Sequence, residues 1–245
     1  MRNIQLVLEY DGTKYNGWQR LGTTENTIQY KLERVLSLMA DEEIEVIGSG
    51  RTDAGVHALN QVANFHTHSP LSLMEIENYC NQYLPKDIVV KKAREADERF
   101  HARYNAKSKR YLYRIWNNRI PTALQRKQVY YIPDALDITA MRKGAAYFIG
   151  SHDFQSFSSV KSKKKSTARE IYEIKIVKKE AEVDIFFHGN GFLHNMVRIM
   201  AGTLIEVGQG KRKAEEIPVI LQGKRREPAG FTAPAQGLFL YEVYY

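Results

Sequence analysis

The sequence predicts an α+β fold, because strand-like and helix-like segments are mixed without a regular βαβ alternation. Residues 4–10 alternate apolar side chains on one face, as in a half-buried strand. Residues 27–39 instead place apolar side chains at helical spacing, and Asn26 with Gln29 predicts a capping box at the start of this helix. At 245 residues and 43% hydrophobic content, the chain can form one large domain or two of ordinary size.

The remaining elements follow from the same two periodicities. Apolar and β-branched segments predict strands at 44–47, 61–65, 87–95, 110–116, 170–177, 182–188 and 237–244. Helical spacing predicts helices near 72–84, 137–149, 193–207 and 213–222.

Composition excludes several classes of protein. No stretch approaches the roughly 20 apolar residues of a membrane span, and no charged-then-apolar leader begins the chain, so we expect a cytoplasmic protein. The single cysteine, Cys80, excludes an intrachain disulfide and a Cys-rich zinc site, and its helical context predicts a core thiol. We expect no metal, because the histidines lack Cys or carboxylate partners at ligand-like spacing. The sequence also lacks a phosphate-binding P-loop and a complete dinucleotide fingerprint, so no nucleotide cofactor is expected.

The distribution of positive charge favours a polyanionic partner. The formal net charge is +8, from 36 basic and 28 acidic residues. Four basic clusters are interleaved with aromatic residues, as in proteins that bind phosphates and stack on unpaired bases. They lie at 103–110, 161–165, 211–213 and 224–226. For any one cluster alone, a solvated surface is the preferred interpretation.

The most informative segment is GRTDAGVH, residues 50–57. It places Asp53 two residues from Arg51, in a glycine-containing loop between two predicted strands. A rigid sheet can present such a carboxylate to a cleft, as a nucleophile or general base requires. The alternative is a turn aspartate that binds its own backbone beside a solvated arginine.

The longer string GSGRTDAGVHALNQVANF, residues 48–65, resembles the signature of the tRNA pseudouridine synthase A family. Five further blocks resemble the same family in the same order along the chain. They are EYDGTKYNGWQ from residue 9, FHAR from 100 with KRYLY from 109, GSHDFQSF from 150, GFLHNMVR from 191 and APAQGL from 233. Together they span nearly the whole chain.

The resemblance implies two similar α/β halves that form one continuous, mainly antiparallel sheet with flanking helices and a central RNA-binding cleft. We expect the halves to be residues 1–105, with the Asp53 loop, and 106–245, with the KRYLY strand. It also implies a homodimer that isomerises uridines of the tRNA anticodon stem-loop to pseudouridine, without a cofactor.

The resemblance assigns roles residue by residue. Asp53 matches the catalytic aspartate of the family. Arg51 would hold the target base outside the helix, since chemistry on a paired base requires flipping it out. Tyr111 would stack on the flipped uracil, Arg198 would pair with Asp53, and Leu238 would line the uracil pocket. For Arg51 the alternative is a loop arginine, and for Tyr111 and Leu238 it is a place in the core.

A second set of residues is expected to contact RNA through positive charge: Arg103, Lys109, Arg110, Lys161, Lys163, Lys164 and Lys165. Two other functions remain open at this point. One is a pseudouridine synthase of the same fold that acts on another structured RNA. The other is a non-catalytic RNA-binding protein.

Overall fold

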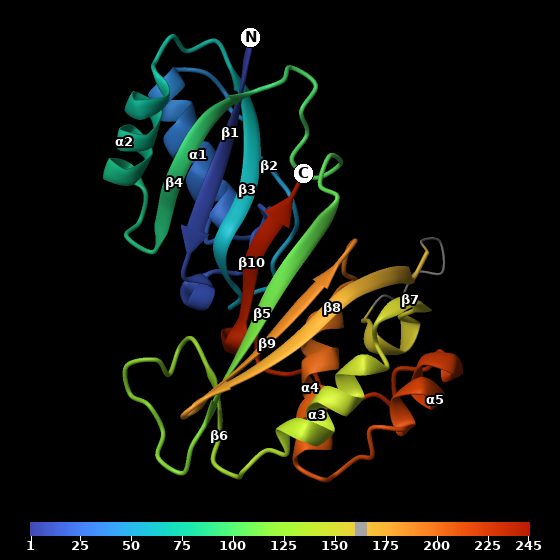
Figure 1. Ribbon diagram of the computed structural model, residues 1–245. Coiled ribbons are helices and arrows are strands. Elements are labelled where there is room, and N and C mark those ends of the chain that lie inside the picture. Colours follow the sequence, from blue (N-terminus) through green and yellow to red (C-terminus); the bar gives the residue numbers. More distant parts are fainter. Residues whose placement is uncertain (160–165) are drawn as a thin grey trace. The chain divides into compact units, whose positions relative to one another are not determined.

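The computed structural model describes residues 1–159 and 166–245, which form two compact units (Figure 1). One unit consists of Met1–Lys107 with Phe239–Tyr245, and the other of Ser108–Leu238. Each contains paired strands and helices, which confirms the α+β class. The closing strand was expected in the second half, but its main chain pairs with the first unit, where Phe239 lies opposite His57.

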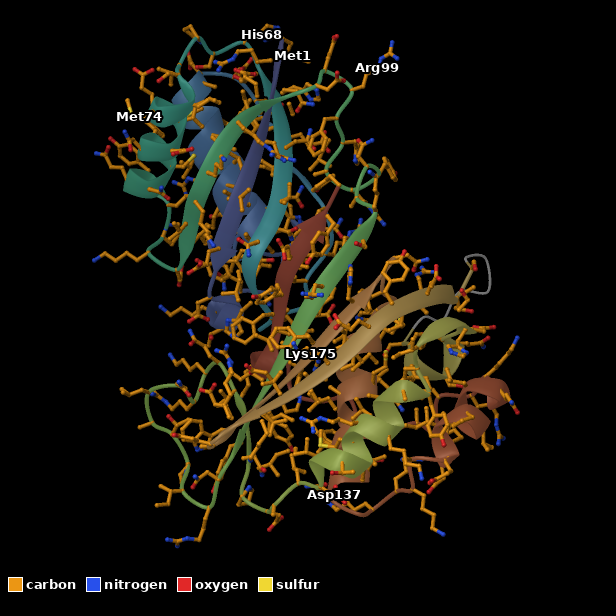
Figure 2. All side chains as sticks on the ribbon, in the orientation of Figure 1. Met1, His68, Met74, Arg99, Asp137 and Lys175 are labelled. Carbon is orange, nitrogen blue, oxygen red and sulfur yellow. The ribbon has the colours of Figure 1, made fainter. Side chains whose placement is uncertain are left out.

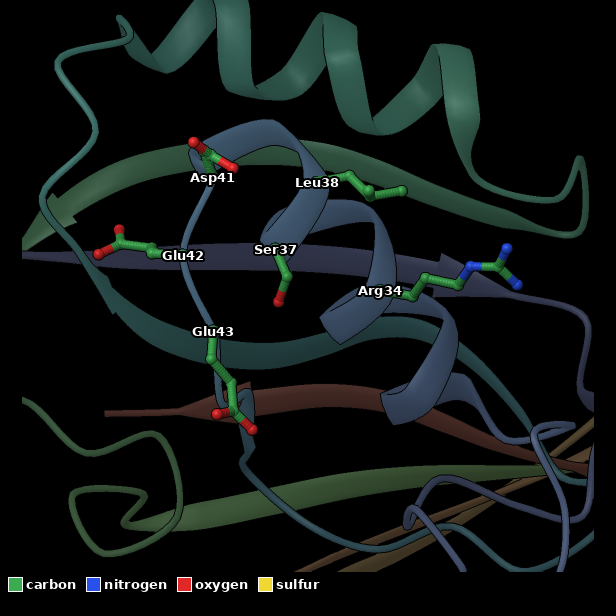
Figure 3. Close-up of a pocket in the computed structure, with 6 residues that line it drawn as sticks. All are labelled: Arg34, Ser37, Leu38, Asp41, Glu42 and Glu43. Carbon is green, nitrogen blue, oxygen red and sulfur yellow. The ribbon is translucent and has the colours of Figure 1, made fainter.

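The first unit is a mainly antiparallel sheet with two helices. Its strand order is β4 (Ile88–Ala96), β1 (Arg2–Tyr10), β3 (His57–Thr67) and β10 (Leu238–Tyr244), and the short β2 (Ile47–Gly48) pairs with β3. β1 is antiparallel to both neighbours, whereas β10 runs parallel to β3. Helices α1 (Ile28–Ala40) and α2 (Leu73–Tyr83) pack together at this sheet, and α1 crosses its strands (Figure 3).

The first strand buries its apolar face, as its alternation predicts, and its opposite face is buried at Asn3 and Gln5 but exposed at Glu9. Asn3 is 2% exposed and donates from Nδ2 to the carbonyl oxygens of Asp97 (2.8 Å) and Phe100 (2.9 Å). Asn64 on β3 is fully buried, and its Oδ1 accepts the Ala102 N–H at 2.8 Å. The segment after β4 therefore covers the second face near Asn3, and the buried amides satisfy the main chain of this segment.

The start of α1 differs by one residue from the expected cap. The Thr27 side chain accepts the N–H of Tyr30 at 3.3 Å, so Thr27 is the N-cap and the capping box at Asn26 is wrong. Gln29 instead donates to the carbonyl oxygen of Val46 at 3.0 Å. This contact joins the helix to the chain that leads into the Asp53 loop.

The second unit also contains a mainly antiparallel sheet. Its order is β5 (Ser108–Asn117), β9 (Glu182–Gly189), β8 (Ala168–Lys179) and β7 (Gly150–Asp153), and β6 (Tyr130–Ile132) pairs in parallel with β5. Three helices accompany it: α3 (Ile138–Ala146), α4 (Met196–Gly208) and α5 (Glu216–Gly223). α3 packs against both α4 and β8.

The structure also bears on the single cysteine and on the length of the helices. Cys80 on α2 is fully buried, and this burial raises the pKa of its thiol to about 12, so it is a core residue. Within the described residues, no helix is long and apolar enough to cross a membrane.

Candidate active site

Asp53 lies in the irregular connection between β2 and β3, where the sequence predicts it. Its carbonyl oxygen accepts the Val56 N–H at 3.1 Å, and Gly55 adopts φ +77°, which closes a tight turn directly after the carboxylate. Asp53 is half-buried, while Arg51 is exposed. The loop therefore presents both side chains near the surface of the first unit.

A cluster of buried polar side chains forms hydrogen bonds with the Asp53 loop. The Tyr10 hydroxyl lies 2.8 Å from Thr52 Oγ1, and Gln61 Nε2 donates to the carbonyl oxygen of Gly50 at 2.9 Å. Ser49 donates to Gln61 Oε1 at 2.6 Å. All four side chains, from Tyr10, Ser49, Thr52 and Gln61, are at most 6% exposed. Buried hydrogen bonds of this kind fix Gly50 and Thr52, the two neighbours of Arg51. Thr52 is also the residue directly before Asp53.

The EYDGTKYNGWQ segment, residues 9–19 and here called the first sequence block, also contacts this loop through its backbone. The Trp18 N–H donates to the Thr52 carbonyl oxygen at 3.0 Å. Gly17 has φ +96°, and a Cβ there would lie 2.7 Å from that carbonyl oxygen. A Cβ on Gly12 would lie only 1.9 Å from the Val56 carbonyl oxygen. These glycines allow two backbones to touch, so the first block braces the Asp53 loop.

His57 anchors the end of the loop. Its ring is 1% exposed and stacks on Phe239 with ring centroids 4.7 Å apart. Its Nδ1 accepts the Gly12 N–H at 3.1 Å and lies 3.1 Å from Asp11 Oδ1. Asp11 in turn caps the short 3-10 helix η1 (Gly12–Lys14). His57 closes the GRTDAGVH string, but nothing in that string predicts its contacts with Phe239 and Gly12.

The second unit carries Tyr111 on β5. Tyr111 is 9% exposed, and its ring meets Phe192 edge to face at 5.1 Å. Tyr113, two residues on, is fully buried and donates from its hydroxyl to the Pro234 carbonyl oxygen at 2.9 Å. Burial raises the pKa of Tyr113 well above its ordinary value, so it remains a neutral donor.

Arg198 lies in the first turn of α4 and is held by two contacts. Its Nε donates to the Ala233 carbonyl oxygen at 2.7 Å, and its Nη1 donates to Asn195 Oδ1 at 3.0 Å. The charge of Arg198 also acts on Tyr113, whose pKa it lowers against the larger effect of burial. Leu238, 6% exposed, is the last residue of the closing block APAQGL that begins with Ala233. Sequence reasoning missed Asn195 and Ala233, which orient the guanidinium.

Two groups of predicted site residues therefore lie in different units. Asp53 and Arg51 belong to the first unit, and Tyr111, Arg198 and Leu238 belong to the second. The expected pairing of Asp53 with Arg198 joins residues of different units and stays a prediction.

The residues expected to contact RNA differ in their surroundings. Arg103 is exposed and Lys109 is half-buried. Arg110 forms an ion pair from Nη2 to Glu173 Oε2 at 2.9 Å, which already compensates part of its charge. Lys161, Lys163, Lys164 and Lys165 lie outside the described residues.

No second chemical centre is evident in the described parts of the chain. Within residues 1–159 and 166–245, no three His, Cys, Asp or Glu side chains are grouped so that they could hold a metal ion. A surface hollow of about 470 Å³ lies at the C-terminal end of α1 (Figure 3). Its lining includes Asp41, Glu42 and Glu43, which would repel a polyanion, and none of the predicted site residues.

Comparison with known proteins gives a consistent family match. The family model described as tRNA pseudouridine synthase matches residues 6–105 and 145–245. "tRNA pseudouridine synthase A 2" of Bacillus cereus (strain ZK / E33L) is 49% identical over 243 residues, covering 99% of each chain. "tRNA pseudouridine synthase A" of Bacillus sp. (strain KSM-64) is 51% identical and covers 98% of each chain. The protein of that name from Acetivibrio thermocellus is 47% identical over the whole of both chains.

Proposed function

The chain belongs to the tRNA pseudouridine synthase family, an isomerase family that converts uridine in tRNA to pseudouridine, and we propose that it acts on the anticodon stem-loop with Asp53 as catalytic nucleophile. The target uridines are positions 38, 39 and/or 40 of the tRNA. The observation that carries the proposal is that the loop with Asp53 is braced by backbone contacts of the first sequence block and by the buried side chains of Tyr10 and Gln61.

The reaction needs an ionised carboxylate and no redox partner. Uracil is detached from C1′ of the ribose by breaking its bond to N1, turned, and rejoined to C1′ through C5. The C5 proton is then lost and N1 gains a proton, so no atom or electron enters or leaves the product. A carboxylate can perform this chemistry by attacking C1′, or by abstracting a proton after the base leaves. We therefore propose a cofactor-free reaction with Asp53 as the nucleophile, and proton abstraction by Asp53 is the alternative.

The other predicted residues would bind and orient the target uridine. Arg51, exposed beside Asp53, would enter the base stack and hold the uridine outside the helix. Tyr111 would stack on the extruded uracil, and Leu238 would contact its apolar edge. Arg198, preset by its two hydrogen bonds, would pair with the Asp53 carboxylate and aim it.

Binding of the tRNA itself would depend on positive charge in both halves, 1–105 and 106–245. Arg103 and Lys109 would contact phosphates. Arg110 would do so more weakly, because Glu173 compensates part of its charge. The lysines at 161–165 would extend this surface. Neutralising those lysines should weaken tRNA binding without changing the rate of conversion of a bound uridine, and unchanged affinity would contradict that role.

Assembly and location follow from the same function. We propose a homodimer that binds tRNA across both subunits, and a cytoplasmic protein, since its substrate is tRNA. Light scattering of the purified protein would test the homodimer, and a monomer at micromolar concentration would contradict it.

Pseudouridine mapping tests the proposed function. The purified protein is incubated without cofactor with unmodified tRNA transcripts and, in parallel, with other structured RNAs. New pseudouridine confined to positions 38–40 of the anticodon arm is the expected result. Modification only of another RNA would contradict the proposed substrate, and tight binding without any product would contradict catalysis.

A further inference from the structure

The connection between β4 and β5 contains, in a turn, an exposed aromatic side chain, Tyr104, that the proposed function leaves without a role. We propose that the ring of Tyr104, held against His101, stacks on an unpaired base of the bound RNA. This inference rests on tRNA as substrate and adds a contact outside the catalytic loop.

The turn is preorganised by its own hydrogen bonds. His101 Nδ1 accepts the N–H of Arg103 at 3.1 Å and that of Tyr104 at 3.2 Å. The His101 N–H donates to Asn105 Oδ1 at 2.7 Å, and the Asn105 N–H returns to the His101 carbonyl oxygen at 3.0 Å. The rings of His101 and Tyr104 lie 4.1 Å apart with 32° between their planes. Binding a base to such a turn costs little additional ordering.

Buried contacts fix the base of this turn to the first unit. The Ala102 N–H donates to the fully buried Asn64, and the Tyr245 hydroxyl donates to the Ala102 carbonyl oxygen at 2.7 Å. Phe100 packs against the Tyr245 ring at 5.1 Å. One side of the turn is therefore packed on the first unit, with Ala102 buried and Phe100 half-buried, whereas Tyr104 is 77% exposed.

The charge around Tyr104 selects an anionic partner. Residues 99–107 include three exposed cations, Arg99, Arg103 and Lys107, and no carboxylate, although Asp97 and Glu98 precede them. Figure 2 shows Arg99 projecting away from the ribbon. An exposed ring among cations is the combination with which proteins bind single-stranded RNA, since cations meet phosphates while the ring takes a base.

The first unit also supplies a matched control. Tyr83 on α2 is 56% exposed and its ring lies 4.5 Å from that of Tyr79. It resembles Tyr104 in exposure and in having a ring neighbour. Its helix, however, carries Glu75 and Glu77 and no Lys or Arg, so it should not meet RNA.

The test compares Tyr104→Ala, Tyr104→Phe and Tyr83→Ala with the wild-type protein. Affinity for an unmodified tRNA transcript is measured by fluorescence anisotropy at several salt concentrations, and conversion is measured in single turnover at saturating protein. Tyr104→Ala should weaken binding on the order of 5- to 100-fold, as for a lost base–aromatic stack, with an unchanged salt slope. Tyr104→Phe and Tyr83→Ala should bind tRNA within about twofold of wild type, because both keep an aromatic ring at position 104. The rate at saturation should not change in any variant.

Three outcomes would overturn the proposal. They are wild-type affinity in Tyr104→Ala, an equal loss in Tyr104→Phe, which would indicate a hydroxyl contact, and a change of oligomeric state in Tyr104→Ala without RNA, which would indicate a protein interface. The proposed function is read separately, from pseudouridine made by the wild-type protein. Wild-type activity with wild-type affinity in Tyr104→Ala would therefore reject the stacking site alone.

Discussion

The hydroxyl of Tyr10 on β1 lies 2.8 Å from Oγ1 of Thr52, the residue before Asp53, and both side chains are buried. A core strand is thereby joined to the loop that carries the proposed nucleophile. The loop position should consequently depend on residues that never touch RNA, as positioning of a reacting group requires.

Replacing Thr52 tests this link. Thr52→Val keeps the shape but leaves the buried Tyr10 hydroxyl without its partner in Thr52, which costs about 1–3 kcal/mol of unfolding free energy. The loop would also shift, and a displacement of about 1 Å can lower turnover roughly 100-fold. Steady-state kinetics should show a lower kcat with little change in KM. Thr52→Ser, which keeps the hydroxyl, should restore most of kcat. Equal activity of the two variants would contradict the link.

The bracing by the first sequence block predicts a large effect at Gly17. Gly17→Ala forces an L side chain to φ +96° and places its Cβ 2.7 Å from the Thr52 carbonyl oxygen. We expect a loss on the order of 1–3 kcal/mol in a urea unfolding experiment, together with reduced activity. Gly22→Ala is the control, because a Cβ there has no neighbour within 4 Å and its φ is not positive. If the two variants unfolded alike, the brace would be refuted.

Arg198 should affect turnover more than folding. Arg198→Ala removes the hydrogen bonds to Ala233 and Asn195, each worth about 1 kcal/mol. We expect its turnover to fall about 100-fold, because the carboxylate of Asp53 would lose its orienting partner. Arg142→Ala is a matched control, since Arg142 also donates to a backbone oxygen, that of Ile176, at 3.0 Å. Single-turnover rates and melting temperatures of both variants would separate the effects, and equal rates would argue against the assigned role.

Glu42 predicts a pH dependence of stability. The hydroxyl of Thr67 and the side chain and N–H of His68 bind its carboxylate and lower its pKa from 4.5 to about 2. The unfolded chain therefore takes up the proton first as pH falls. The stabilisation is complete above about pH 4.5 and is lost as pH falls towards 2.

Glu42→Gln should flatten the stability profile between about pH 4.5 and 2, measured by urea unfolding at each pH. Glu43→Gln, at the exposed neighbouring position seen in Figure 3, should leave the slope unchanged. A wild-type slope in Glu42→Gln would contradict the assigned contacts.

Much of the fold was predictable because it depends on local periodicity. Residues 27–39, for example, form α1 at Ile28–Ala40. Long-range contacts were not predictable in this way. Nothing near β10 in sequence indicates that it pairs with β3. The sequence also does not distinguish an N-cap at Thr27 from one at Asn26, because the side chains of both residues can accept a hydrogen bond from a helix N–H.

The same division applies to the candidate site. Asp53 could be found from its motif, because the residues that identify it are neighbours in sequence. The partners that hold the site are distant: Tyr10 and Gln61 flank the loop from two strands, and Ala233 reaches Arg198 across 35 residues. Only the folded chain brings such groups together.

The most direct test of the central claim is the single-turnover rate of pseudouridine formation in Asp53→Asn, at protein concentrations that saturate unmodified tRNA. Asparagine preserves the shape of the side chain and removes its negative charge. We expect the rate to fall at least about 1,000-fold while tRNA affinity stays within a few-fold of wild type, as for loss of a nucleophile. A rate within tenfold of wild type would contradict the assignment of Asp53 as the catalytic residue.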